Sequence, residues 1–241
     1  MKTQIVIGLA ALMATSLLIA DAKDDVKSAA KKLADSSGYS WKSNTESAGG
    51  GGGGGRGGGP TEGKAIKDGT VCLSMTRGDN KIEAFAKGEK GAIKTQEGWQ
   101  SIEEAGQAAQ GGQAGPGRFL GRMLANYKTP AVQAGELADK VKELKKDGDA
   151  YAGDLTEDGA KSLMTFGRGG QGANAPEISG AKGSVKFWVK DGTLTKYEFK
   201  VQGKVSRNGN DMEVDRTTTI EIKDVGTTKF EVPEEAKKKM S

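Results

Sequence analysis

Two glycine-rich segments of the chain come close to motifs that bind phosphate groups. Residues 58–65 match the nucleotide-binding pattern GxxxxGK[ST] except at the last position. That position needs a hydroxyl group to hold magnesium, and here it is Ala65. Residues 167–172 match the dinucleotide-binding pattern GxGxxG, but a predicted helix precedes them where that motif requires a strand. Because 38 of the 241 residues are glycine, such matches arise by chance, and we assign a phosphate-binding role to neither.

Side chains that perform nucleophilic, acid–base or metal chemistry are scarce. The chain has no histidine, which excludes Ser-His-Asp and Cys-His catalytic sites and every histidine-ligated metal site. Cys72 is the only cysteine, so the chain has no second cysteine for an intrachain disulfide or a zinc or redox pair. The carboxylate pairs Asp24-Asp25 and Glu103-Glu104 lie on expected helix starts or polar faces, where solvated carboxylates are ordinary. The sequence therefore predicts a protein that is not an enzyme and uses no cofactor or metal.

The overall composition limits the classes of partner. The 241 residues fit a single domain, and 35% hydrophobic with only 5% aromatic residues predict a modest, mainly aliphatic core. The formal net charge of +4 comes from 36 basic and 32 acidic residues, which is close to balance. Nucleic-acid binding would call for clustered arginines interleaved with aromatic residues, and the sequence shows no such cluster. We therefore expect no nucleic-acid partner.

The clearest structural signal lies in residues 180–233, where apolar and polar side chains alternate. This two-residue period predicts three antiparallel strands and the start of a fourth, with turns at Asp191-Gly192 and Asn208-Gly209-Asn210. One face of this meander is apolar and the other is polar. Exposure of that apolar face to water would cost a free energy of about 25 cal/mol per Å². Helices of the chain or a ligand must therefore cover it.

The rest of the chain predicts helices, a second meander and three glycine-rich loops. The strands are expected at residues 37–43, 70–75, 81–86, 92–95, 99–102 and 150–155. The helices are expected at residues 25–34, at 119–127, from beyond Pro130 through Leu144 to a basic end at residues 145–148, and after the predicted N-cap Thr156. The loops are expected at residues 48–60, 106–117 and 167–175. This order of elements predicts an α+β fold with an antiparallel sheet.

The first 22 residues predict a signal peptide. Lys2 supplies the basic start, residues 5–19 form an apolar run too short to span a bilayer comfortably, and Ala20-Asp21-Ala22 has the A-x-A form of a cleavage site. Residues 21–25 contain no cysteine, so the lipobox of a lipoprotein is missing. We expect cleavage after Ala22, no membrane span in the mature chain, and a periplasmic or secreted protein.

The sequence of the closing meander resembles that of a known family. It reads Val-Lys-Phe-Trp-Val-Lys-Asp-Gly-Thr-Leu from Val185, and ends in Lys223-Asp224-Val225-Gly226-Thr227-Thr228 and Val232-Pro233. With the signal peptide, the first helix and the inserted helices, it resembles the bacterial envelope carriers of the LolA/LppX type. The glycine-rich inserts and the missing lipobox depart from that pattern. The resemblance implies one domain over residues 23–241: a curved antiparallel sheet, or incomplete β-barrel, with helices packed in or over its concave face.

The same resemblance implies a carrier that holds a lipid or another acylated molecule beneath a lid helix over residues 119–127. Burial of about ten methylene groups would yield on the order of 8 kcal/mol before ordering costs. By position alone, Arg118 and Arg122 are nearest to the arginine with which the lipoprotein carrier holds its lid. The expected apolar lining consists of Phe119, Met123, Tyr127, Val185, Phe187, Val189, Tyr197, Phe199, Val201, Met212, Val214, Ile220 and Ile222.

Other interpretations fit these residues. The apolar face is also explained by a core filled with side chains and no ligand, or by a purely structural envelope protein. A further alternative is an interaction or stress-sensor module of the same fold, which binds another envelope protein and has no lipid cargo. Trp188 favours this alternative because it lies opposite Phe187, between Lys186 and Lys190, and an exposed tryptophan is a common interface anchor. A helix such as residues 25–34 that covered Trp188 would remove that support.

Overall fold

The computed structural model of this protein describes residues 10–48, 61–77, 80–95, 97–107, 124, 127–164, 176–207 and 209–241. The strands are Gly38–Ser47 (β1), Thr61–Ile66 (β2), Thr70–Arg77 (β3), Asn80–Lys87 (β4), Lys90–Thr95 (β5), Gly98–Ser101 (β6), Lys145–Asp147 (β7), Ala150–Asp154 (β8), Glu177–Lys190 (β9), Thr193–Arg207 (β10) and Asn210–Lys223 (β11). The helices are Ala10–Ala34 (α1), Ile102–Gln107 (α2), Pro130–Asp139 (α4), Glu157–Met164 (α5) and Glu234–Lys239 (α6).

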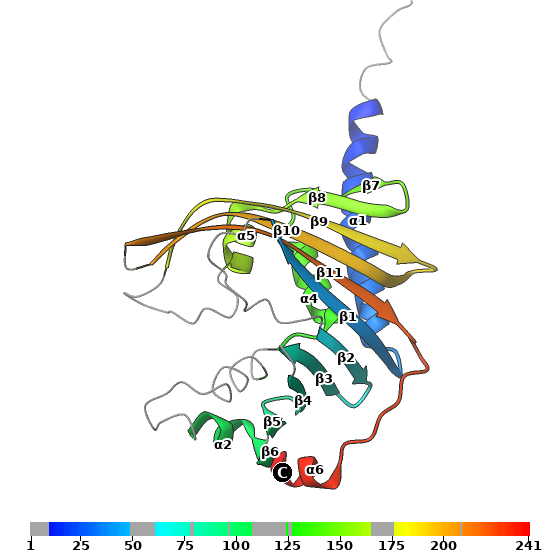
Figure 1. Ribbon diagram of the computed structural model, residues 1–241. Helices are drawn as coiled ribbons and strands as arrows, with labels where there is room; N and C mark the ends of the chain where they lie inside the picture. The colour runs from blue at the N-terminus through cyan, green and yellow to red at the C-terminus, as the bar shows by residue number, and fades with distance from the viewer. Residues whose placement is uncertain are drawn as a thin grey trace, which may run out of the picture.

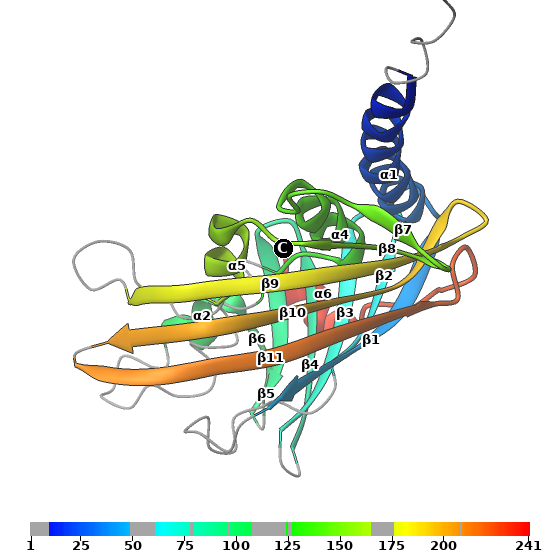
Figure 2. The same cartoon turned by 90° about the horizontal axis from the view of Figure 1, so that it is seen from above.

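The eleven described strands form one antiparallel sheet in the order β6-β5-β4-β3-β2-β1-β11-β10-β9-β8-β7. Two meanders, β1 to β6 and β7 to β11, are joined where β1 pairs with β11. Strands β6 and β7 are the two ends of the order, so the sheet stays open. Figure 1 shows the sheet bent around a hollow that contains α4 and α5, and Figure 2 shows the long strands of the second meander from above. This confirms the predicted α+β fold, with a curved antiparallel sheet and helices on its concave side.

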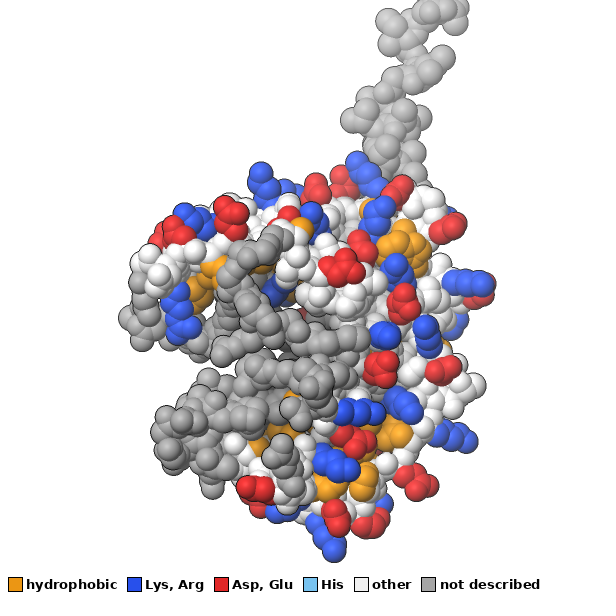
Figure 3. Space-filling model, viewed as in Figure 1, with side chains coloured by type: hydrophobic (Ala, Val, Ile, Leu, Met, Phe, Trp, Pro, Cys, Tyr) orange, Lys and Arg blue, Asp and Glu red, His pale blue; other side chains and the backbone are white. Residues whose placement is uncertain are grey.

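The surface of the molecule carries both signs of charge. Figure 3 shows basic and acidic side chains interspersed over the face in view. Many of them are paired at the surface, for example Lys31 with Asp35 at 2.6 Å and Lys87 with Asp68 at 2.7 Å. Such exposed pairs contribute about 0–1 kcal/mol each, so the stability of the fold must come from its core.

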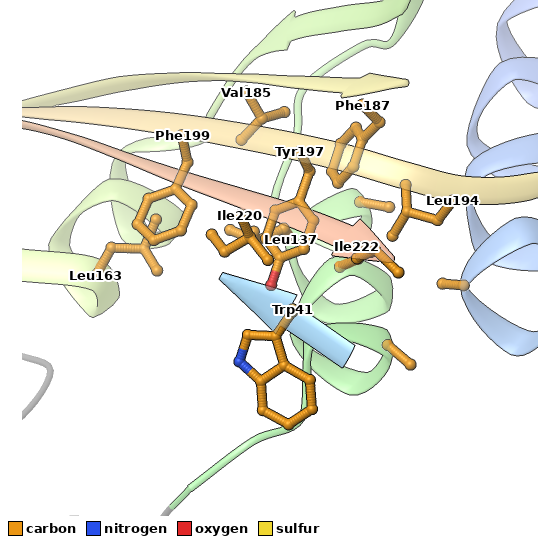
Figure 4. Close-up of a cluster of buried hydrophobic side chains, with 14 of the residues drawn as sticks. Trp41, Leu137, Leu163, Val185, Phe187, Leu194, Tyr197, Phe199, Ile220 and Ile222 are labelled. Carbon is orange, nitrogen blue, oxygen red and sulfur yellow. The ribbon is translucent and has the colours of Figure 1, made fainter. Parts of the chain in front are cut away.

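The three long strands β9, β10 and β11 follow the alternation in the sequence. Asp191 and Gly192 have φ angles of 53° and 67°, as a tight two-residue hairpin turn requires. On the inner face Phe187 and Tyr197 are fully buried, and their rings stack with centroids 6.2 Å apart. Figure 4 shows these side chains pointing to the same side of the sheet as Val185, Leu194 and Ile220. The predicted apolar face is therefore the inner face that forms the core.

Helix α1 covers one end of the hollow and packs against α4 and β10. Small side chains allow the two helices to approach closely, because the buried residues of this contact region include Ala22, Ala29, Ala30, Ala131, Ala134 and Ala138. Polar contacts align the same helices: the Lys23 ammonium donates to the Val141 carbonyl at 2.6 Å, and Lys27 pairs with Asp139. The predicted inner residues Val26 and Leu33 are fully buried.

Helix α1 begins at Ala10, earlier than the predicted start at Asp25. The sequence prediction started the helix after the signal peptide, whereas residues 10–24 also favour helical structure and continue it without a break. Figure 1 shows the first half of α1 projecting from the body of the molecule.

Strand β2 was not predicted, and it contains the end of the GxxxxGK match. Gly63, Lys64 and Ala65 lie within an extended strand that pairs with β1 on one side and β3 on the other. A phosphate-binding loop must wrap its amide groups around the ligand, and these residues are extended instead. The near-match at residues 58–65 therefore has no phosphate-binding geometry in its described part.

The prediction that the helix after Pro130 continues to Leu144 was wrong, because α4 ends at Asp139. Beyond it, Val141 forms an isolated bridge with Leu155, and the Lys142 amide donates to the Asp154 carbonyl at 2.9 Å. The segment that looked like a basic helix end is strand β7, at the edge of the sheet. Pairing with β8 thus prevails over the helical spacing of the apolar residues.

The chain after β11 packs on the outer face of the first meander. Helix α6 lies against β5 and β6, and its Ala236 is buried with Phe85, Ala92 and Trp99. Cys72 is half-buried against the same cluster, and burial raises the pKa of its thiol to about 11. The thiol is therefore un-ionised at neutral pH.

Several predicted features lie outside the described residues. They include the GxGxxG residues 167–172, nearly all of the three glycine-rich loops, and the lid helix over 119–127 except Leu124 and Tyr127.

The packing of α1 gives a first prediction. Leu33→Ala removes a fully buried side chain from the contact of α1 with the core, and should lower the free energy of unfolding by about 2–5 kcal/mol. Urea denaturation followed by circular dichroism measures this. Lys31→Ala, on the same helix but in an exposed ion pair, should cost less than about 1 kcal/mol. Equal effects of the two substitutions would contradict the described packing.

Candidate ligand-binding site

A cavity of about 240 Å³ opens on the concave side of the sheet. The inner faces of β1, β2, β3, β10 and β11 line it, together with the start of α4 and the end of α5. Its lining residues are Trp41, Ser43, Thr45, Thr61, Leu73, Met75, Tyr127, Lys128, Pro130, Gln133, Leu163, Tyr197, Phe199, Arg216, Thr218 and Ile220. The pairing of β1 with β11 places this cavity where the two meanders meet.

The residues predicted to line a ligand site divide into three groups. Four of them line the cavity: Tyr127, Tyr197, Phe199 and Ile220. Seven lie in or against the hydrophobic core and do not line it: Val185, Phe187, Val189, Val201, Met212, Val214 and Ile222. Phe119 and Met123 lie outside the described residues, as do Arg118 and Arg122. The inner sheet face is thus partly a core filled by side chains and partly the wall of a cavity.

An aromatic wall bounds the cavity on the side of β1. The rings of Trp41 and Tyr127 stack with centroids 6.2 Å apart and an interplanar angle of 18°. Trp41 lies directly over its strand partner Gly63, where an added Cβ would be 2.0 Å from Cζ2 of the indole. Glycine at this position of β2 therefore provides the space that the indole occupies. The sequence placed Trp41 in a strand but gave no signal that its ring faces a cavity.

Buried tyrosine hydroxyls attach the start of α4 to the sheet. The Tyr197 hydroxyl donates to Oε1 of Gln133 at 2.6 Å, and Tyr39 forms hydrogen bonds with Thr129 and Ala131. Burial raises the pKa of Tyr197 well above its ordinary value, and it also raises the pKa of Tyr39 and of Tyr127. These phenols are therefore uncharged at neutral pH and act only through hydrogen bonds and packing.

Polar side chains occupy the part of the cavity near α5. Arg216 of β11 donates from Nη2 to the carbonyl oxygen of Leu163, in the last turn of α5. Next to it on the sheet, the hydroxyls of Thr45 and Thr218 are hydrogen-bonded at 3.0 Å. Sequence reasoning missed Arg216, because it followed only the apolar members of the alternation in β11. The alternation itself could have placed Arg216 on the inner face, midway between Val214 and Thr218.

The described part of the chain was expected to contain no metal site. Among those residues, no three His, Cys, Asp or Glu side chains gather to form a candidate metal site. None of the helices in the described part of the chain is both long enough and apolar enough to span a membrane.

Comparisons with known proteins give a distant structural likeness. No protein-family model and no curated protein matches the chain. The crystal structure of the lipoprotein LppX of Mycobacterium tuberculosis matches with a TM-score of 0.46 and 10% sequence identity, over 88% of this chain and 98% of that one. LprF of Mycobacterium bovis matches with a TM-score of 0.46 and 10% identity, over 90% and 98% of the two chains. Both matches fit a distant resemblance to LppX-type proteins.

The contact between Trp41 and Gly63 gives a second prediction. In Gly63→Ala the new methyl group occupies space held by the indole, so the ring must move and the aromatic wall must change. Trp41 is 3% exposed, and we expect its fluorescence emission to shift to longer wavelength as it gains contact with water. Trp41→Phe, made in the Gly63→Ala protein, identifies how much of the fluorescence of the three tryptophans comes from Trp41. Gly135→Ala is the matched control, because an added Cβ on that part of α4 meets open space; an unchanged spectrum in Gly63→Ala would contradict the described contact.

The buried phenols give a third prediction. An unfolded tyrosine ionises near pH 10, whereas folded Tyr197 holds its proton to higher pH, so the unfolded state loses protons first as pH rises. The free energy of unfolding should therefore fall between about pH 9 and 11, and fall less steeply in Tyr197→Phe. Urea denaturation at a series of pH values measures both slopes. Lysine ionisation is common to the two proteins, so equal slopes would show that Tyr197 is not buried as described.

Proposed function

We propose that this protein holds a hydrophobic ligand, the acyl chain of a lipid or of another acylated molecule, without altering it chemically. The observation that supports this most directly is the cavity of about 240 Å³ on the concave side of the sheet. Binding pockets for small molecules are usually about 300–1,000 Å³, so this cavity suits a slender guest. A single acyl chain has that shape.

The lining fits such a guest better than a polar one. Trp41, Leu73, Met75, Phe199 and Ile220 offer aromatic and aliphatic contact without a demand for hydrogen bonds. Each buried methylene group contributes about 0.8 kcal/mol, so roughly ten of them would offset the cost of ordering the chain. Binding of this kind needs no catalytic group.

The proposed route of entry is past the lid helix predicted over residues 119–127. Tyr127 stacks on Trp41 at the rim of the aromatic wall, and it lies at the end of the lid helix predicted over residues 119–127. We propose that this helix lifts to admit the ligand, while the bonds from Tyr39 and Tyr197 hold the start of α4 in place.

The proposed location is the periplasm or the exterior of the cell, with the signal peptide removed after Ala22. One contact of α1 supports a boundary near this point: Lys23 binds the Val141 carbonyl, whereas the first half of the helix projects from the body. Cleavage there would leave residues 23–241 as one domain and would remove the small buried side chain of Ala22 from its core.

A protein-binding module is the second candidate, supported by Trp188. This residue lies on the face of β9 opposite Phe187, whereas the buried residues of α1 join the cluster that contains Phe187. Trp188 is half-buried, and the Lys196 ammonium lies 4.7 Å from the centroid of its ring. An aromatic ring with a cation on it suits an interface anchor.

The experiment that tests the proposed function is native mass spectrometry of the mature protein, purified from the periplasm without detergent. A ligand mass that organic extraction removes, and that belongs to an acylated molecule, is the expected result. A clean mass of the empty protein, with no shift on addition of phospholipid or lipopeptide, would contradict ligand holding and favour the protein-binding module.

A pair of neighbouring substitutions makes the same test specific to the cavity. Met75→Trp fills the cavity from β3 and should reduce the bound fraction at least tenfold. Ser74→Trp places the same side chain on the opposite face of the strand and should leave binding unchanged. Thermal unfolding of both proteins verifies that they are folded. Retention of the ligand by folded Met75→Trp would mean that it binds elsewhere.

A further inference from the structure

The floor of the cavity changes from apolar to polar along β1 and β11. Side chains of one face recur every second residue, roughly 7 Å apart along a strand. From the apolar end to the polar end, the paired residues on the inner face are Trp41 with Ile222, Ser43 with Ile220, Thr45 with Thr218, and Ser47 with Arg216; Ile222 and Ser47 are on this face but do not line the cavity. Figure 1 shows that β11 ends near α1, so the end that contains Arg216 lies away from that helix. The polar end of this floor lies beside α5, where Arg216 meets the Leu163 carbonyl.

Arg216 is the one charged residue on the inner face of β11. The other inner residues of β11 are Met212, Val214, Thr218, Ile220 and Ile222. A half-buried guanidinium group is costly unless its donors are satisfied, and the carbonyl of Leu163 accepts from one of its nitrogens. The group also lines the cavity, where its planar fork of donors can meet the oxygen atoms of a carboxylate or phosphate.

The other charges around the cavity do not oppose an anion at Arg216. Among the described lining residues two are basic, Arg216 and Lys128, and none is acidic. Lys128 pairs with Glu136 of α4 at 2.6 Å. Asp215 is adjacent in sequence but lies on the outer face, where Lys200 and Gln202 bind it at 3.3 and 2.8 Å. A cavity with low-dielectric walls and a basic lining attracts anions.

We infer that the ligand is an anionic amphiphile, whose carboxylate or phosphate group binds Arg216 while its hydrocarbon chain lies against Trp41 and Ile220. This inference rests on the proposed function and adds the class of head group. The hydroxyls of Thr45 and Thr218 flank the head group, and Phe199 separates the two ends. Figure 4 shows Phe199 beside Leu163, with Tyr197 and Trp41 toward the other end of the cluster.

The test compares two probes of equal chain length, decanoate and decanol, by isothermal titration calorimetry at neutral pH. Decanoate should bind the wild-type protein about tenfold more tightly, because charge-assisted hydrogen bonds are stronger than neutral ones. Arg216→Gln should lower the affinity for decanoate to that for decanol and leave decanol binding unchanged. Arg216→Lys should keep part of the preference. Arg207→Gln, at the exposed end of β10, is the matched control and should behave as wild type.

The outcomes separate this inference from the proposed function. Equal affinity of the wild-type protein for both probes would overturn the anionic head group and leave the hydrophobic cavity standing. Failure of both probes to bind would contradict the proposed function itself. A preference for decanoate that survives in Arg216→Gln would overturn the role of Arg216. Because Arg216 also binds α5 through Leu163, thermal unfolding is measured for each variant. If Arg216→Gln does not fold, the role of Arg216 in the preference for decanoate is judged from Arg216→Lys.

Discussion

The pairing of β1 with β11 is the interaction on which the rest of the structure depends. It joins residues 40–47 to residues 216–223, near opposite ends of the chain, and makes one sheet of two meanders. Without it each meander would expose an unpaired edge, and Trp41 would have no place beside Ile222 and Tyr197. Contacts so distant in sequence carry an entropic cost of loop closure, which the burial of side chains from both meanders must offset. The cavity depends on this pairing, because its floor takes side chains from both meanders.

The fold was predictable where local pattern and tertiary structure agree. The alternation in residues 185–222 gave the three long strands, the turn at Asp191-Gly192 and the inner face, because a half-buried strand must alternate. Strand β2 gave no such signal: it reads Thr-Glu-Gly-Lys-Ala-Ile, and its glycine is there to make room for an indole from another strand. The end of α4 was missed for a similar reason, since pairing of the following residues with β8 is invisible in their own spacing.

The site was less predictable than the fold, because a cavity depends on which strands lie side by side. Tyr197, Phe199 and Ile220 were found from their own strands, whereas Trp41, Leu73 and Met75 belong to a meander whose position depends on the β1–β11 pairing. Small and hydroxyl-bearing residues such as Ser43 and Thr61 also escaped notice. In a sheet face otherwise filled by large side chains, their small size leaves space. A prediction that follows only the apolar residues of each strand does not detect that space.

The segment that follows β11 connects the two meanders a second time. It leaves the second meander at Lys223, is fixed at the start of β1 where the Gly226 amide donates to the Gly38 carbonyl at 2.7 Å, and reaches α6 on the outer face of β5 and β6. Figure 1 shows it passing from β11 to α6 at the right of the view. A chain cannot stretch beyond about 3.6 Å per residue, so residues 224–233 set an upper limit on the distance between the end of β11 and α6. The segment is therefore a covalent tether between the two meanders, in addition to the hydrogen bonds between β1 and β11.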